Sequence, residues 1–172
     1  MEIKEAIQQR RSIRKFLDKE VPDNDLRSLV EAGSLAPSAG NLQAWKFILV
    51  VDKTLVNKID MFSPGLSGKP PVIMAICSDY AYAEERGGKN SKEYGCIMDA
   101  SMAAENIMLA ALEKGLGTCA VKSYNEIAVR KLLKLPAHIH LELLISIGYP
   151  DGDPRIPVRK PLNETLIYNE WS

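Results

Sequence analysis

The sequence lacks the features that would place it at a membrane or on nucleic acid. No hydrophobic run approaches the roughly 20 residues of a membrane-spanning helix. The N-terminus is charged from Glu2 onward and has no apolar core of a signal peptide. The 22 basic and 22 acidic residues cancel, so no excess charge attracts nucleic acid or an anionic membrane. We therefore expect a cytoplasmic protein with no nucleic-acid or membrane partner.

Cysteine and histidine are also sparse. Cys77, Cys96 and Cys119 are widely spaced and form neither a CxxC pair nor a disulfide framework, which favours a reducing compartment. His138 and His140 alternate as they would on a strand, and we predict no metal site from them.

Glycine-rich phosphate motifs are missing as well. Gly115-Leu116-Gly117 begins a G-x-G, but no third glycine and no helix start follow. This excludes a dinucleotide fingerprint, and no Walker P-loop occurs. A bound phosphate would therefore have to be held by arginine side chains. No nucleophile elbow or H-E-x-x-H occurs either, which leaves catalysis to a bound cofactor.

What is present indicates one domain that mixes helices and strands. The 172 residues suffice for one buried core, and no repeat or linker divides them. Residues 80–93 are polar and contain glycine, so we expect a mobile surface segment there. Apolar spacing predicts helices at 2–10, 22–35, 53–60, 97–114 and 125–133. Short runs rich in β-branched residues and bounded by turn residues predict strands at 46–51, 72–77, 118–121 and 141–147.

The predicted helix at 97–114 is apolar nearly all round, and Gly115 follows it as a C-cap. Such a helix is buried on more than one side. It is either central in the domain or meets a second subunit with its outer face. The tail, residues 150–172, could not close a core by itself, so we expect it to lie along another surface such as that of a partner chain.

Two polar segments are candidates for a binding site. Arg10 and Arg14 are four residues apart, so a continued helix would place both on one face with Ser12 between them. Guanidinium groups suit a phosphate, although a solvated basic helix end would have the same sequence. Residues 37–41 combine small side chains with hydrogen-bonding groups and could frame a flat heterocycle. An ordinary helix-to-strand loop has the same composition.

In their order along the chain, these segments resemble the nitroreductase family of FMN enzymes, from Ala6 to about Pro161. The resemblance rests on residues 10–16, residues 36–45, Gly115-Leu116-Gly117-Thr118-Cys119, Gly148-Tyr149-Pro150 and Arg159-Lys160. Asp99, Ala104, Asn106 and Leu109 on the long helix also match.

The resemblance implies an α+β sandwich with a mainly antiparallel sheet flanked by helices, in an intertwined homodimer with FMN at the interface. Residues 1–172 would form one domain, with 162–172 as an arm that packs on the partner subunit. Arg10, Ser12, Arg159 and Lys160 would hold the phosphate, and Arg14 would lie at the pyrimidine edge. The cofactor-binding residues that it implies are Arg10, Arg11, Ser12, Arg14, Pro37, Ser38, Ala39, Asn41, Gln43, Val121, Lys122, Ser123, Arg159 and Lys160, with Pro37, Ser38, Ala39 and Asn41 coming from the other subunit.

The implied activity is an oxidoreductase that moves hydride from NADH or NADPH to flavin N5. It then passes electrons to an electron-poor acceptor, such as a nitroaromatic or a quinone, in a ping-pong cycle. Arg14 would stabilise the reduced flavin, and no side chain would act as nucleophile or acid-base catalyst. Lys122 departs from the family, where many relatives carry glycine or an acidic residue beside N5. Reductive dehalogenation or flavin-fragmenting chemistry on the same scaffold, a non-catalytic flavin-binding module, and a nucleic-acid binder are the alternatives.

Overall fold

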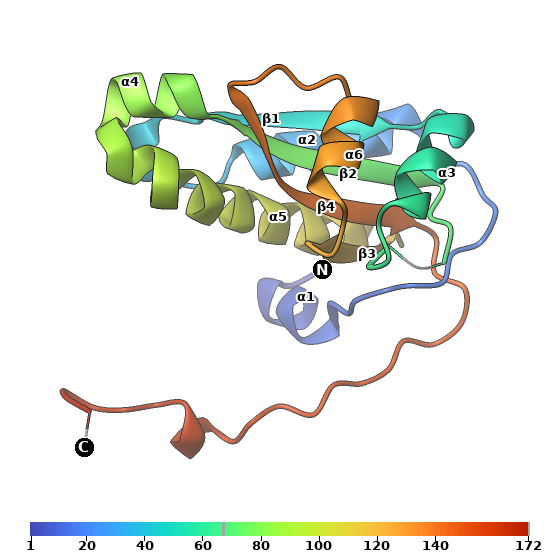
Figure 1. Cartoon of the computed structure of the whole chain (residues 1–172). Coiled ribbons are helices and arrows are strands. Elements are labelled where there is room, and N and C mark those ends of the chain that lie inside the picture. The colour runs from blue at the N-terminus through green and yellow to red at the C-terminus, as the bar shows by residue number, and fades with distance from the viewer. Residues whose placement is uncertain (67, 172) are drawn as a thin grey trace.

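A computed structural model describes residues 1–66 and 68–171 and places a four-stranded sheet at the centre of the protein (Figure 1). The strand order is β1-β2-β4-β3, and all three pairings are antiparallel. The strands are β1 (Trp45–Val50), β2 (Val72–Asp79), β3 (Gly117–Val121) and β4 (Ile139–Gly148). All four predicted strands are confirmed, with ends that differ by up to two residues.

Helices cover both faces of the sheet because the central strands are apolar on both sides. On β2, Met74 and Ile76 pack with α2 (Asp23–Ser34) and α5 (Cys96–Glu113). Their neighbours Ile73 and Ala75 face the opposite way, toward α3 (Lys53–Met61) and α6 (Glu126–Leu132). This alternation is the period of two that a strand imposes on its side chains. The predicted α+β sandwich is confirmed.

The long helix α5 lies under the sheet in Figure 1. Its small and aliphatic side chains at Ala100, Ala103, Ala104 and Ile107 are buried. The predicted C-cap is confirmed, because Gly115 has a φ of 66° and the amide of Leu116 donates to the carbonyl of Ala111. Ile97, Met98 and Met102 on the same helix stay exposed on this chain.

The prediction of a mobile segment at residues 80–93 is wrong. The chain there forms α4 (Tyr80–Asn90) and continues through one π-helical turn, η2 (Ser91–Gly95), into α5. The Asp79 carboxylate caps α4 by accepting from the amide of Tyr82 at 3.0 Å. Gly88, with a φ of 75°, takes up a kink that other residues would resist. The sequence did not predict this helix because α4 buries a single side chain, that of Ala83, and its composition is therefore polar without an apolar stripe.

The stretch Tyr80–Glu113 is the one described segment that is long and apolar enough to span a membrane by length and composition. Its apolar part is 44% buried inside the protein, where α5 packs on α2 and the sheet. The core helix of a soluble domain meets the same criterion.

The segment after α1 (Ile3–Gln9) runs along the edge of the sheet, where it pairs with β3 and with the segment that follows β4. Ser12 forms a parallel bridge with Thr118, and Phe16 pairs with Pro150 at the end of β4. From Asp151 onward the tail runs out beneath α5 (Figure 1) and carries one short 3-10 turn, η3 (Leu162–Glu164). Its large apolar side chains are exposed, with Val158 at 97% and Trp171 at 87%.

Candidate functional site

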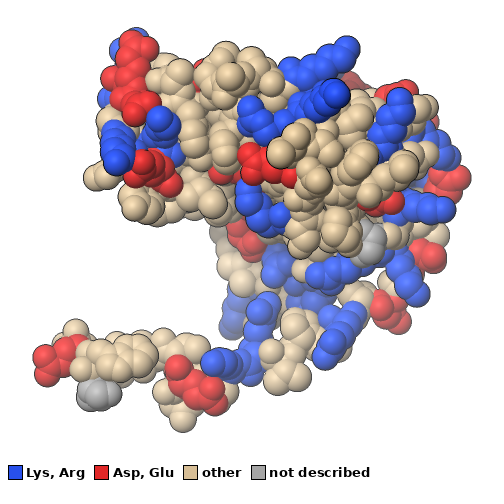
Figure 2. All heavy atoms as spheres, viewed as in Figure 1, with Lys and Arg blue, Asp and Glu red and all other residues tan. Residues whose placement is uncertain are grey.

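A pocket of about 480 Å³ lies between the end of α1 and the beginning of the tail. We call it the arginine pocket. It is lined by Arg10, Arg11, Ser12, Arg14, Arg155, Pro157, Val158 and Arg159. None of these side chains is acidic, and Figure 2 shows Lys and Arg gathered where the tail leaves the body. Five guanidinium groups around one hollow suit an anion that carries more than one negative charge.

The backbone of residues 12–15 is fixed from two sides. On one side, the amide of Ile13 donates to the carbonyl of Thr118 at 2.9 Å. Gly117 lets Ile13 come this close, since a Cβ there would lie 2.5 Å from Cγ1 of Ile13. On the other side Gly68 packs against Arg14, where a Cβ would lie 1.7 Å from the Arg14 carbonyl oxygen. The strand edge and the Gly68 loop therefore hold the Arg14 backbone in place.

Arg10 and Arg11 are oriented by local contacts. Nε of Arg10 lies 3.2 Å from a carboxylate oxygen of Glu105 on α5, and the Arg10 side chain is 20% exposed. Nη1 of Arg11 donates to the carbonyls of Gln8 and Arg10 at the end of α1. Arg11 therefore lines the pocket while it also completes its own helix.

Among the predicted phosphate-binding residues, Arg10, Ser12 and Arg159 line this one pocket, and Lys160 is not among its lining residues. Arg155 lines it too and was missed. The sequence offered a signal, because Arg155 stands four residues before Arg159 in a proline-containing segment, but only the fold shows which side chains of an irregular tail face α1.

The second predicted segment forms a tight turn with unusual backbone angles. Gly40, Asn41 and Gln43 have φ values of 56°, 54° and 52°. The hydroxyl of Ser38 accepts from the amide of Gln43 at 3.0 Å, and the side chain of Gln43 donates to Oδ1 of Asn41 at 3.1 Å. We call residues 37–43 the cofactor loop, after the contact with a cofactor that the sequence predicts for them. Its polar groups are held by one another in a fixed arrangement.

Asp99 on α5 anchors the first half of this loop. The amide of Ala39 donates to both carboxylate oxygens of Asp99, at 3.1 Å and 3.2 Å. Asp99 is 5% exposed, and burial raises its pKa while the Ala39 amide acts in the opposite direction. The resemblance in sequence included Asp99 without indicating its contacts. In the structure Asp99 fixes the backbone of the loop at Ala39.

The cofactor loop does not contribute to the arginine pocket of the same chain. It packs on α4 and η2, where a Cβ on Gly87 would meet Leu42 and one on Gly95 would meet Ala39. The lining of the arginine pocket contains no residue of 37–43. The two halves of the predicted site therefore lie on different parts of this chain.

The third predicted segment, residues 121–123, contacts the same loop as Arg14 does. Val121 ends β3, and the amide of Gly65 donates to the carbonyl of Ser123 at 3.2 Å, so the loop that touches Arg14 also touches Ser123. Lys122 donates to the hydroxyl of Tyr124 at 3.2 Å and to the carbonyl of Leu141 at 3.3 Å. Its ammonium group is thus bound to the sheet edge.

Other reactive side chains offer no second centre. Cys77, Cys96 and Cys119 are buried as free thiols, and burial raises the pKa of Cys77 to about 12. A thiol with so high a pKa is a poor nucleophile at neutral pH. Among residues 1–66 and 68–171, no three His, Cys, Asp or Glu side chains are placed to hold a metal.

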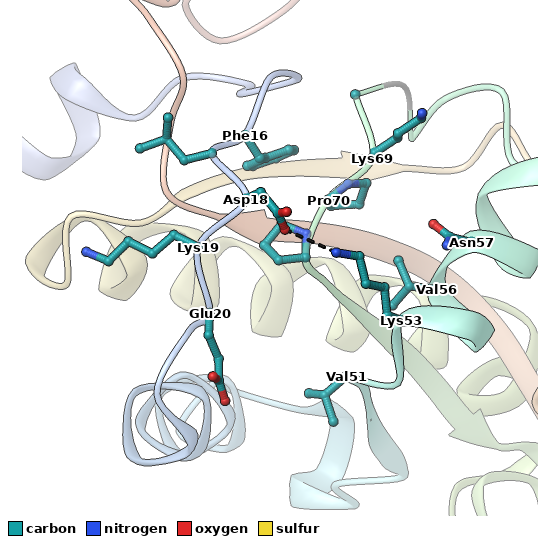
Figure 3. Close-up of a pocket in the computed structure, with 13 residues that line it drawn as sticks. Phe16, Asp18, Lys19, Glu20, Val51, Lys53, Val56, Asn57, Lys69 and Pro70 are labelled. Atoms are coloured by element: carbon teal, nitrogen blue, oxygen red, sulfur yellow. Dashed lines mark hydrogen bonds and ion pairs between the residues drawn. The ribbon is translucent and has the colours of Figure 1, made fainter.

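A larger pocket, of about 610 Å³, lies between residues 16–20, α3 and residues 68–71. Asp18 and Lys53 point toward each other across it at 3.3 Å (Figure 3). Its charged lining is mixed, with Asp18 and Glu20 beside three lysines. Because these opposite charges offset one another, this pocket is less suited to a phosphate than the arginine pocket is.

Comparison with known proteins gives consistent results. The sequence model described as "Nitroreductase family" matches residues 7–70 and 63–149. A protein of Methanothermobacter thermautotrophicus that carries the name NADH dehydrogenase/NAD(P)H nitroreductase is 32% identical over 160 residues, which is 90% of this chain and 80% of that protein. The structure of a nitroreductase family protein from Clostridium difficile 630 superposes with a TM-score of 0.87 at 25% identity, covering 99% of this chain and all of that one.

Two more distant relatives indicate the range of reactions. The NADPH-flavin oxidoreductase of Vibrio harveyi is 27% identical over 176 residues, which is 97% of this chain and 73% of that protein. The iodotyrosine deiodinase of Thermotoga neapolitana is 27% identical over 190 residues, which is 94% of this chain and 95% of that protein.

Proposed function

The chain belongs to the nitroreductase family of oxidoreductases, and we propose that it is a cytoplasmic, FMN-dependent enzyme that oxidises NADH or NADPH. The observation that carries this proposal is the arginine pocket, because a flavin mononucleotide ends in a phosphate dianion. Relatives named NAD(P)H nitroreductase and NADPH-flavin oxidoreductase support the same cofactor and donor class.

The donor set fits FMN. Arg10, Ser12 and Arg159 would bind the phosphate, with Lys160 next to them in the chain, and Arg155 adds a further guanidinium. Arg14 would place its charge at the ring edge, and the backbone of residues 121–123 would orient the ring. When bound, FMN supplies the redox chemistry, taking hydride from the nicotinamide and passing electrons to a second substrate in a ping-pong cycle. The protein contributes orientation and fixed positive charge.

We propose a homodimer in which each site takes its cofactor loop from the partner subunit. The separation of this loop from the arginine pocket within one chain supports the arrangement. So does the row Ile97, Met98 and Met102, which is exposed on α5 at 44%, 57% and 37%. An apolar row on a core helix is typical of a subunit interface. The arm, residues 162–172, would pack on the partner.

The acceptor is an electron-poor small molecule, such as a nitroaromatic or a quinone. Reductive dehalogenation is the second candidate, favoured by the deiodinase relative and by α4, which gives this chain a helical segment beside the cofactor loop. A non-catalytic flavin-binding module is the remaining alternative. Anaerobic addition of NADH or NADPH to the purified, FMN-loaded protein separates it from an enzyme, because only an enzyme loses the flavin absorbance promptly.

Substitution of Arg14 by glutamine tests the role of this residue. We expect the rate of flavin reduction in a single turnover to fall by more than the affinity for FMN, because Arg14 lies at the ring and the other arginines hold the phosphate. Lys15→Gln is the matched control, since Lys15 is the next residue but does not line the arginine pocket. Reduction of FMN at the normal rate in Arg14→Gln would contradict this role of Arg14. Absence of FMN binding in the unaltered protein would refute the proposed function as a whole.

A further inference from the structure

A buried carboxylate lies outside the arginine pocket, near the beginning of β4. The pairing of β2 with β4 shifts between Ile76 and Cys77, whose partners are Leu143 and Leu141, so Glu142 has no partner across the strands. The side chain of Glu142 is 2% exposed, and its Oε1 is buried without a hydrogen bond. A buried charge in this situation is costly unless a cation offsets it.

His140 is placed to supply that cation. Its Nδ1 lies 3.9 Å from a carboxylate oxygen of Glu142, and its Nε2 lies 3.4 Å from a carboxylate oxygen of Glu126 on α6. At this distance Nδ1 makes no hydrogen bond to Glu142, and it is buried without any other hydrogen-bond partner. His140 can therefore act on the Glu142 carboxylate only through its charge, which the protonated imidazole has and the neutral one lacks.

The imidazole also touches the first residue of α4. The rings of His140 and Tyr80 stack with centroids 4.5 Å apart and an angle of 12°. The amide of Tyr80 donates to the carbonyl of His138 at 2.9 Å, and Tyr80 packs against a small buried cluster of Ala44, Ala83 and Cys96. The charge on His140 therefore affects how strongly Tyr80, the first residue of α4, is held in its position.

Tyr80 in turn adjoins the end of the cofactor loop. Ala44 follows Gln43, and its carbonyl accepts from the amide of Asp79 at 2.8 Å. The loop is thus held at two points. Asp99 holds Ala39, and the turn Asp79–Tyr80 holds Ala44.

We propose that Glu126, His140 and Glu142 are positioning residues for FMN, which seat Tyr80 and through it the cofactor loop while His140 is protonated. The inference rests on the proposed function, because it takes residues 37–43 to contact the cofactor. A histidine is charged at acid pH and loses its charge as the pH rises through its titration range. The cofactor loop then loses one support, and affinity for FMN falls.

The other titratable groups around this cluster leave the role to His140. Cys77 comes from β2, Cys96 from α5, and Tyr124 from the turn before α6, and burial raises the pKa of each, so they remain neutral near pH 7. Burial raises the pKa of Tyr80 as well, and the adjacent carboxylate of Glu142 raises it further, so Tyr80 is a neutral neighbour of Glu142 near pH 7. Asp79 is bound to the amide of Tyr82. Among the described residues, neither Arg130, which donates to the carbonyls of Pro136 and Ile139, nor Lys122, which donates to that of Leu141, pairs with Glu142.

The test compares the two histidines of the chain. The Kd for FMN is measured by quenching of flavin fluorescence from about pH 6 to about pH 8.5, the range in which histidine titrates. For the unaltered protein and the control His138→Gln, we expect the affinity to fall roughly fivefold or more over this range, a typical coupling between linked sites. For His140→Gln the affinity should be low and independent of pH. Adding Glu142→Gln to that variant should restore affinity, because no buried charge is left unpaired.

A second readout uses the protein without cofactor. Amide hydrogen exchange at residues 39–44 and 80–83, corrected for the intrinsic effect of pH, should rise with pH in the unaltered protein and not in His140→Gln. A variant His140→Gln that keeps the pH profile of the unaltered protein in both assays would overturn the inference and leave the proposed function intact. Absence of FMN binding at every pH would refute the proposed function, while hydrogen exchange would still decide whether His140 supports the loop.

Discussion

Replacement of Gly68 by alanine tests how tightly the Arg14 backbone is held. Gly68 has a φ of 99°, and a Cβ there would lie 1.7 Å from the carbonyl oxygen of Arg14. Two costs follow. The backbone conformation costs an L residue about 1–2 kcal/mol, and the added methyl group must displace Arg14 or the loop, at about 1–3 kcal/mol.

Together these costs lower the free energy of unfolding by about 2–5 kcal/mol. In a chain of this size each kcal/mol shifts the melting temperature by about 2–4 °C, so we expect a fall of about 4–20 °C. The affinity for FMN should fall as well, because Arg14 moves with its backbone.

Gly115→Ala is the matched control. Gly115 also has a positive φ, of 66°, but a Cβ there meets nothing within 4 Å. It carries the conformational cost alone, a fall of about 2–8 °C, and should leave FMN binding unchanged. Thermal unfolding followed by circular dichroism and an FMN titration measure both effects. If Gly68→Ala melts no lower than Gly115→Ala and binds FMN equally well, the contact with Arg14 does not constrain the site.

Two further predictions concern α5. Burial raises the pKa of Asp99, so the folded protein binds its proton more tightly than the unfolded chain and the free energy of unfolding falls as the pH rises through that titration. Asp99→Asn removes this loss, while its amide oxygen still accepts from the amide of Ala39. In urea unfolding from about pH 3 to about pH 7, the free energy of unfolding of the variant should rise with pH relative to that of the unaltered protein. A difference between the two proteins that stays constant with pH would contradict this. Met102→Glu should give a monomer or an aggregate without FMN, because the exposed row of α5 cannot bury a charge against a partner, and a monomer that retains flavin in gel filtration would argue against a site at the interface.

The core could be predicted from the sequence because its apolar segments are distinct. The short apolar runs at 72–77 and 141–147, and the continuous apolar surface of 97–114, predict strands and a central helix without reference to distant contacts. The segment at 80–93 could not be predicted in this way. Its helix is set by the cap at Asp79 and by the packing of Ala83, and neither produces a long apolar stripe.

The candidate site residues could be proposed from the sequence, but their arrangement could not. The clustered arginines at 10–14 suit a phosphate and a solvated helix end equally, and only the family resemblance favoured the phosphate. That Asp99 holds Ala39 across 60 residues, or that Arg155 faces α1, depends on tertiary packing. The histidines show the same limit. No acidic cluster surrounds them in sequence, yet a strand irregularity and α6 bring Glu142 and Glu126 to His140.

The tail has a consequence for how the site is completed. In the described chain its backbone hydrogen bonds to the body end with that from Asp151 to Lys15, so Arg155 and Arg159 lie on a segment with little else to fasten it. Glu105 offsets the charge of Arg10, but the four other guanidinium groups that line the pocket have no carboxylate partner among the described residues, so the end of α1 and the tail repel each other. If the pocket holds the phosphate of FMN as we propose, part of the binding free energy goes into ordering the tail. Protein without the cofactor should then be cleaved in the tail more readily by proteases.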